Sequence, residues 1–409
     1  MGKFISLGEY NKQYKYIWIY LVIRFITKFI FDYKLVFDQI KPDILDIPYG
    51  TFISLQLEFF GFFIIPLILK VVKKLSKKNK PDTSIIQENF LIYNEIDIST
   101  DYGIDKRDYF LYINIFLLVI MELFWAVFIT FQTEILDYWM FEMLFFEIFN
   151  SKFLKSKIYK HHIISLIFIL LSCSLINTIS IILSFSYDTD DVKIIDNRNW
   201  LIPFNVIISL LLYLFQAFLF CNEKYYLEKK IISISDYMFC YGIFGVITCF
   251  ICIIISTFVP CGNNSLPELS KFICNYQDEN ENYYLDSYII YFKELAKEYL
   301  GLKIFLIIIY ITLLYSSSFY CYVIFKKLNP IYHICMYRLN FLILDILIFI
   351  NDLVNNTIEG ITITKNILDI LILLFYSLGA VIYLEFIELN FCGLNFYSKK
   401  NIKERALSD

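Results

Sequence analysis

Charged side chains interrupt several long apolar stretches of the sequence, and their types and spacing suggest chemistry. Arg24, Lys28 and Asp32 recur every four residues, so they lie along one face of a helix. Arg338 is the lone charge in CMYRLNFLI, and Asp345 follows seven residues later on the same helical face. One interpretation is a cationic wall that binds an anionic or carboxylate-bearing ligand. The alternative is a set of fixed ion pairs inside a helical bundle.

Two glutamates in other apolar stretches suggest a second kind of chemistry. Glu122 lies in the stretch 109–131, and Glu142 lies in 138–153. A carboxyl group removed from water favours its neutral form, which suits a site that takes up and releases a proton. The alternative is that each glutamate pairs with Arg24, Lys28 or Arg338 and holds the helices together. Gln216 is a further ligand-binding candidate, although hydrogen bonding between helices is the ordinary role of such a residue.

Membrane-spanning helices must position these residues, because the composition excludes a soluble protein. Hydrophobic residues make up 58% of the 409, and the mean hydropathy is +0.59, whereas soluble domains contain ~45–50% apolar residues. A spanning helix needs about 20 mostly apolar residues. We therefore predict an all-α polytopic membrane protein with ten transmembrane helices, at about 16–37, 50–69, 109–131, 138–153, 161–185, 200–221, 237–259, 301–325, 332–351 and 366–389.

Basic and acidic residues alternate between the predicted loops. KVVKKLSKKNK (70–80) and KFLKSKIYK (152–160) are strongly basic, and so is the C-terminal tail. Since basic loops stay in the cytosol, we predict both termini there, together with a 70–108 loop and a 390–409 tail. The 260–300 loop is predicted to be luminal. Its residues 283–299 have apolar positions near helical spacing, which predicts a juxtamembrane helix that either caps the mouth of the protein or simply associates with the membrane.

The predicted luminal loops also contain residues typical of the secretory pathway. Cys261 and Cys274 share the 260–300 loop in an oxidising compartment, which favours a disulfide, with two free thiols as the alternative. Asn263 and Asn355 begin the N-x-[ST] sequons, and both are predicted to be luminal, where glycosylation occurs. An endomembrane such as the Golgi, the endoplasmic reticulum or a lysosome or vacuole is therefore the expected location.

Several functional classes find no support in the sequence. HExxH, DHHC, Walker A and GxGxxG patterns are absent, and the three histidines fall in predicted cytosolic turns. We therefore expect no enzymatic activity, no metal site and no cofactor. The net charge of −4 and the pI of about 5.6 exclude a globally basic nucleic-acid binder. The expected partners are the lipid bilayer and an unidentified small-molecule substrate, and a homodimer is left open.

Four segments resemble the drug/metabolite transporter superfamily, and in particular its nucleotide-sugar-transporter-like members. FEMLFFEIFNSKFLKSKIYKHHIISLIFILL (141–171) resembles the fourth and fifth helices of that superfamily. Residues 204–262 are similar to the sixth and seventh helices. They contain a helix with a Gln, a turn with Glu and Lys, a second helix with a G-x-F-G pattern, and a final Pro-Cys-Gly. KKLNPIYHICMYRLNFLILDILIF (326–349) resembles the eighth-to-ninth helix junction, and LGAVIYLEFIELNFCGLN (378–395) resembles the tenth helix.

The resemblance implies two five-helix inverted repeats around a central cavity, at about 16–185 and 200–389, that transport by alternating access. On this basis we expect a secondary transporter that moves a small polar organic solute, with nucleotide sugars as one candidate class. Arg24, Lys28, Arg338, Glu122, Glu142 and Gln216 are its cavity candidates. A non-transporting membrane scaffold or receptor-like protein that retains the fold is the alternative hypothesis.

Overall fold

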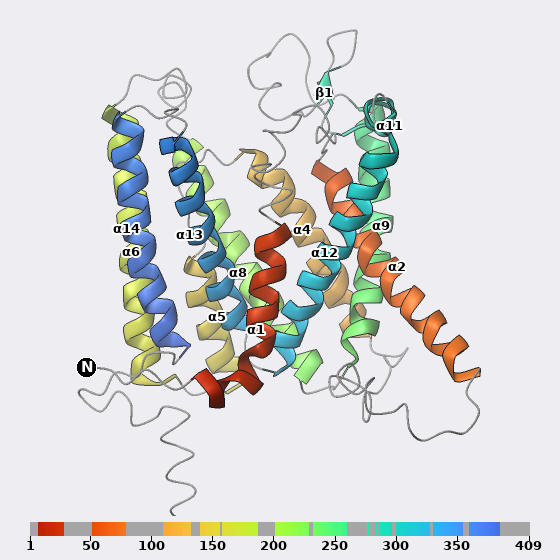
Figure 1. The fold of residues 1–409 in the computed structure, drawn as a ribbon, viewed down its shortest axis with the longest axis horizontal. Helices are drawn as coiled ribbons and strands as arrows, with labels where there is room; N and C mark the ends of the chain where they lie inside the picture. The colour runs from red at the N-terminus through yellow and green to blue at the C-terminus, as the bar shows by residue number, and fades with distance from the viewer. Residues whose placement is uncertain are drawn as a thin grey trace, which may run out of the picture. The chain divides into compact units, whose positions relative to one another are not determined.

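The structure is a computed structural model, and within its described residues the chain is almost entirely α-helical (Figure 1). It describes residues 7–27, 51–78, 109–131, 140–155, 158–186, 201–228, 232–259, 276–277, 283–284, 286–296, 300–327, 330–354 and 360–384. The long helices are α1 (Leu7–Thr27), α2 (Thr51–Lys78), α4 (Tyr109–Phe131), α5 (Met140–Phe153), α6 (Lys160–Ser186), α8 (Leu201–Glu228), α9 (Ile234–Phe258), α12 (Leu300–Lys327), α13 (Pro330–Val354) and α14 (Gly360–Tyr383). A short helix, α11 (Tyr288–Leu295), follows the antiparallel pair of β1 (Tyr276–Gln277) and β2 (Tyr283–Tyr284).

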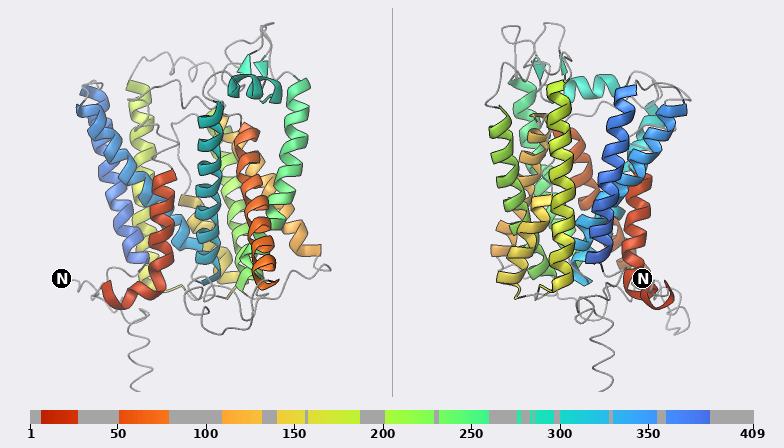
Figure 2. Two further views of the ribbon diagram at one scale, coloured as in Figure 1. Left: turned by 45° about the vertical axis from the view of Figure 1, so that its right-hand side comes forward. Right: turned by 90° about the vertical axis from the view of Figure 1, so that its left-hand side faces the viewer.

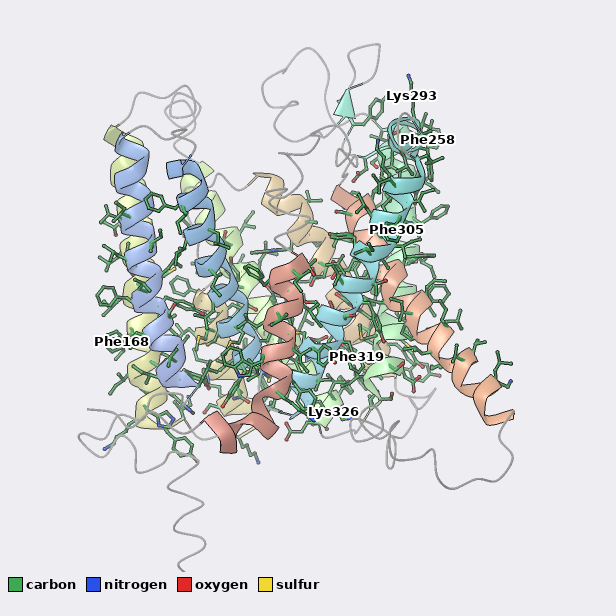
Figure 3. The ribbon with its side chains drawn as sticks, viewed as in Figure 1. Phe168, Phe258, Lys293, Phe305, Phe319 and Lys326 are labelled. Atoms are coloured by element: carbon green, nitrogen blue, oxygen red, sulfur yellow. The ribbon has the colours of Figure 1, made fainter. Side chains whose placement is uncertain are left out.

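The long helices make the protein an integral, multi-pass membrane protein. Among the described residues, five stretches are long and apolar enough to cross a bilayer: Phe52–Val72, Tyr109–Val127, Val206–Glu228, Ile234–Phe258 and Leu300–Lys326. Large apolar side chains such as Phe258 and Phe305 are exposed on these helices (Figure 3). A bilayer accepts such side chains, whereas water would not. The predicted class, a helical membrane protein, is confirmed at this level.

Helix ends depart from the predicted span ends where charged residues follow an apolar run. Each predicted span overlaps one long helix, but α2 continues to Lys78 instead of ending near residue 69, and α8 continues to Glu228 instead of ending near residue 221. Lysine and glutamate favour helix formation, so the helix can continue after the apolar run has ended. The connection after α2 therefore begins later than residue 70. Within the described part of the predicted juxtamembrane segment 283–299, the helix is Tyr288–Leu295.

The chain divides into two compact units. The first unit comprises Met1–Leu21, Gln132–Cys221 and Asn329–Asp409, and it contains α5, α6, α13, α14 and most of α1 and α8. The second unit comprises Val22–Phe131 and Asn222–Leu328, and it contains α2, α4, α9, α11, α12 and the ends of α1 and α8. Each unit therefore combines segments from both halves of the sequence.

Helices α2 and α9 form the central contact of the second unit. They run antiparallel, because Lys70 near the end of α2 forms an ion pair with Asp236 at the start of α9. Two glycines of α9 let the backbones approach closely: a Cβ added to Gly242 would lie 2.5 Å from the backbone nitrogen of Phe63, and one added to Gly245 would lie 2.1 Å from Cγ of Phe59. Helix α12 packs on α2, and α4 packs on α9.

Helices α6 and α14 form the corresponding contact of the first unit, and they lie side by side in both views of Figure 2. They are also antiparallel, since the Ser165 hydroxyl near the start of α6 donates a hydrogen bond to the Gly379 carbonyl near the end of α14. A Cβ added to Gly379 would lie 2.9 Å from Cγ1 of Ile169. Helix α13 packs on α14, and α5 packs on both α6 and α13.

Candidate functional site

The sequence-predicted site residues fall in both units, and some lie outside the described residues. Arg24 in α1 and Glu122 in α4 are half-buried in the second unit. Glu142 in α5 is buried and Gln216 in α8 is half-buried, both in the first unit. Arg338 lies within α13, but its side chain is not among those described. The predictions for Lys28, Cys261, Cys274, Asn263 and Asn355 fall outside the described residues.

The second unit brings ionisable groups from three helices together at membrane depth. The carboxyl group of Glu122 in α4 interacts electrostatically with the carboxyl group of Glu58 in α2 and with the guanidinium of Arg24 in α1. Two of these residues are among the predicted candidates. Glu58 is not among them, although it also lies within an apolar run, 50–69. The structure therefore brings Arg24 and Glu122 together and adds a second carboxylate beside them.

Glu223 in α8 is a further member of this carboxylate cluster that sequence reasoning missed. Its side chain is only 1% exposed, and its Oε1 accepts a hydrogen bond of 2.7 Å from the Tyr237 hydroxyl in α9. Tyr322 in α12 is a second hydrogen-bonding partner, and its ring meets that of Tyr237 edge-on at 5.3 Å. Glu223 also interacts electrostatically with Glu122, so the cluster consists of Arg24, Glu58, Glu122 and Glu223.

Glu223 lies two residues beyond the predicted end of its span at residue 221, so it is not among the predicted site residues. The helix continues to Glu228 and keeps Glu223 inside the bundle. The helical register could have indicated this, since Gln216 and Glu223 are seven residues apart and therefore share a face of α8. The neighbouring Lys224 is also largely buried, and its Nζ lies 4.0 Å from Oε2 of Glu228.

Carboxylates outnumber basic groups among the four described members of the cluster. Three carboxylates and one guanidinium sum to −2 when all four groups are ionised (1 − 3 = −2). Charge at membrane depth costs about 2.5–3.5 kcal/mol per residue on insertion scales. Phenolic hydroxyl groups supply hydrogen bonds to Glu223 but no charge.

The first unit contains a separate buried glutamate with a tyrosine partner. The Tyr383 hydroxyl in α14 donates a hydrogen bond to Glu147 in α5, which is 3% exposed. The ring of His162 stacks on that of Tyr383 at 4.5 Å, and His161 lies edge-on to His162 at 4.2 Å. Cys335 in α13 interacts electrostatically with Glu147. Among the described residues, no group of three His, Cys, Asp or Glu side chains is placed to hold a metal ion.

Comparison with known proteins gives no independent assignment: no protein-family model matches the chain, and no curated protein matches it. The functional conclusion therefore rests on the helix packing and on the groups buried within each unit.

Proposed function

We propose that the protein is a secondary transporter of the drug/metabolite type, which moves a small polar organic solute across an internal membrane by alternating access. The pairing of the long helices carries this proposal. A transporter built from two five-helix inverted repeats has a defined pattern, in which each contact in one repeat recurs five helices later. The pairings within the two units can be compared with that pattern.

The extensive pairings among the ten long helices are consistent with a repeat of five. In chain order, α2 and α9 are the second and seventh helices, and α6 and α14 are the fifth and tenth, so each of these pairs joins equivalent helices. The pairing of α2 with α12 corresponds to that of α9 with α4, and the pairing of α2 with α4 corresponds to that of α9 with α12. Likewise, α5 with α6 corresponds to α13 with α14, and α5 with α13 joins equivalents.

Orientation supports the same proposal. A repeat with an odd number of spans enters the membrane in the opposite direction to its copy, so equivalent helices must be antiparallel. The two large contacts between equivalents, α2 with α9 and α6 with α14, are both antiparallel. Ten spans would also place both termini on one side, and the lysine-rich segments would make that side the cytosol.

In this proposal the carboxylate cluster of the second unit is the functional site. Arg24 would bind an anionic group of the solute, whereas Glu58, Glu122 and Glu223 would take up protons or a cationic group. Tyr237 and Tyr322 hold the Glu223 carboxylate in place. Binding that changes the net charge of a buried cluster changes the energy of each conformation, and this couples binding to a conformational change.

Transport by purified protein in proteoliposomes tests the proposal. Uptake of radiolabelled nucleotide sugars, nucleotides and amino acids is measured by counterflow, in which a luminal pool of each unlabelled compound drives exchange. For the compound that exchanges, we expect Glu122→Gln and Glu223→Gln to lower the rate at least about tenfold, the cost of ~1.4 kcal/mol in the rate-limiting state. Asp236→Asn is the matched control, because Asp236 lies on α9 beside Tyr237 but pairs with Lys70. Rates equal to wild type in both glutamate variants would refute the site.

A membrane scaffold or receptor-like protein that retains the fold is a second candidate, and one observation favours it. Glu147 and Glu223 each accept a hydrogen bond from a buried tyrosine, as expected of carboxyl groups that hold a bundle together. A scaffold would show no counterflow with any compound, while Glu147→Gln and Glu223→Gln would lower thermal stability. In a transporter, Glu223→Gln would lose exchange under conditions in which the variant is as fully folded as wild type.

A further inference from the structure

Residues 286–288, at the start of α11, join the start of α2 to the end of α9 within the second unit. Oδ2 of Asp286 accepts a hydrogen bond of 2.6 Å from the backbone N–H of Phe52, the second residue of α2. The Ser256 hydroxyl near the end of α9 donates to the backbone carbonyl of Asp286 at 3.0 Å. The Tyr288 hydroxyl in α11 donates to Oε1 of Gln56 at 2.7 Å. Three side-chain hydrogen bonds therefore tie this segment to both helices.

Apolar contacts hold the same segment from the side of α11. Tyr291 and Leu295 are buried, and the ring of Tyr288 lies 6.1 Å from that of Phe250 in α9. Lys293 is exposed on α11 (Figure 3). The helix therefore presents one face to the second unit and another to its surroundings. The segment's hydrogen bonds to α2, at Phe52 and Gln56, lie in the first two turns of that helix, ahead of Glu58 in the carboxylate cluster.

We propose that residues 286–295 form a latch at the end of the second unit where α2 begins and α9 ends. A proton on Asp286 holds this latch in its docked position. Asp286 is completely buried, so its ionised form would leave a charge without water. Among the described residues, Oδ1 has no hydrogen-bond partner, so a proton on that oxygen neutralises the group and leaves the bond from Phe52 to Oδ2 in place.

The direction of the pH response follows from the two states of Asp286. Burial raises the pKa of the docked Asp286 to about 7, although the amides at the start of α2 oppose the shift. A released, solvated Asp286 would return to an ordinary pKa near 4. The docked state therefore binds the proton more tightly, so acid favours docking and a rise in pH favours release. Between pH 6 and pH 8 the docking equilibrium falls about tenfold.

The groups that face Asp286 do not reverse this direction. On α9, the Cys249 thiol interacts electrostatically with Asp286, and on α11 the Tyr288 phenol does so. Free thiols and phenols titrate above about pH 8, and burial raises the pKa of Tyr288 further. On α2 the facing groups are backbone amides and the neutral Gln56, with Glu58 as the nearest carboxylate along that helix. Among these described neighbours, Asp286 is therefore the group that titrates near pH 7.

The latch deepens the proposed function, and its role in substrate access rests on that function: release would open the end of α2 that leads to Glu58. Its docking is tested without transport. Hydrogen exchange of the full chain in lipid nanodiscs is followed by mass spectrometry at pH 6 and pH 8, with correction for the intrinsic rate. We expect peptides from 51–57 and 286–296 to exchange about tenfold faster at pH 8, whereas peptides from the start of α9 stay unchanged.

Three variants make the test specific. Asp286→Asn should abolish the pH dependence, and Asp236→Asn, at the opposite end of α2 and α9, should retain it. Tyr288→Phe loses the bond to Gln56 but keeps Asp286, so exchange should rise at both pH values with the tenfold ratio preserved. The last variant keeps the proposal testable if Asp286→Asn does not fold. Equal corrected exchange at the two pH values in wild type, or a pH dependence that survives in Asp286→Asn, would overturn the latch, whatever the transport assay shows.

Discussion

The glycine contact between α2 and α9 allows a graded prediction about stability. A methyl group added at Gly242 would lie 2.5 Å from the backbone nitrogen of Phe63 and 2.8 Å from the backbone oxygen of Phe59. An ordinary contact begins near 3.4 Å, so α2 would have to move by about 0.9 Å (3.4 − 2.5). Backbone atoms cannot rotate away, unlike the end of a side chain. Overpacking of this kind costs about 1–3 kcal/mol, and the better helix propensity of alanine returns up to about 1 kcal/mol.

We therefore expect Gly242→Ala to lower the free energy of unfolding by about 2 kcal/mol, measured by SDS titration in mixed micelles. Gly61→Ala should cost less, because the nearest atom to its Cβ, at 2.8 Å, is the terminal Cγ2 of Ile311, although the carbonyl oxygen of that residue lies at 3.3 Å. Gly301→Ala is the matched control, since its Cβ would meet nothing within 4 Å. If Gly242→Ala is as stable as Gly301→Ala, the close approach of the two backbones is wrong.

Three further predictions concern the buried polar groups and the surface. Tyr383→Phe leaves buried Glu147 without its hydroxyl donor and should cost about 1–3 kcal/mol in the same titration; an unchanged midpoint would contradict that bond. Asp236→Asn breaks a partly exposed ion pair with Lys70 and should cost less than about 1 kcal/mol. In wild type, the folded pKa of Asp286 lies above its unfolded value, so its contribution to the free energy of unfolding should fall by about 1.4 kcal/mol from pH 6 to pH 8. Asp286→Asn should lack this slope.

The positions of the helices could be predicted from the sequence better than their ends. An apolar run of about 20 residues must satisfy its backbone internally in a bilayer, so the runs at 50–69 and 237–259 predicted α2 and α9 directly. Their ends depend on a different property. The lysine-rich segment after residue 69 cannot lie in hydrocarbon, but it can remain helical in water, and α2 continues to Lys78. Hydropathy therefore locates the membrane-spanning part of a helix and leaves the length of the helix open.

The candidate site could be predicted only in part, because its members come from four helices. Arg24 and Glu122 stood out as single charges in apolar runs, and the structure brings them together. Glu58 and Glu223 were not among the predicted candidates, yet both interact with Glu122. Glu58 lies within the run 50–69, and Glu223 lies two residues beyond the predicted end of its span at residue 221. A single sequence shows the depth of a residue along its own helix but not the helices that face it. The folded structure supplies that missing information by placing Glu122 beside groups of α1, α2 and α8.

The buried polar groups do not follow the repeat of five helices that we propose. The Glu147–Tyr383 bond joins the fourth and tenth helices, so a shift of five helices would place its counterpart between the ninth and the fifth. The other buried glutamate with a tyrosine partner, Glu223, lies instead on the sixth helix and bonds to the seventh. Three of the four close glycine contacts, by contrast, lie where helices related by that shift meet: Gly242 and Gly245 between α2 and α9, and Gly379 between α6 and α14. The fourth, at Gly61, lies between α2 and α12. The carboxylate cluster is thus distinct from the packing contacts. Substitutions in the cluster should therefore separate the loss of the proposed binding from a loss of stability of the fold.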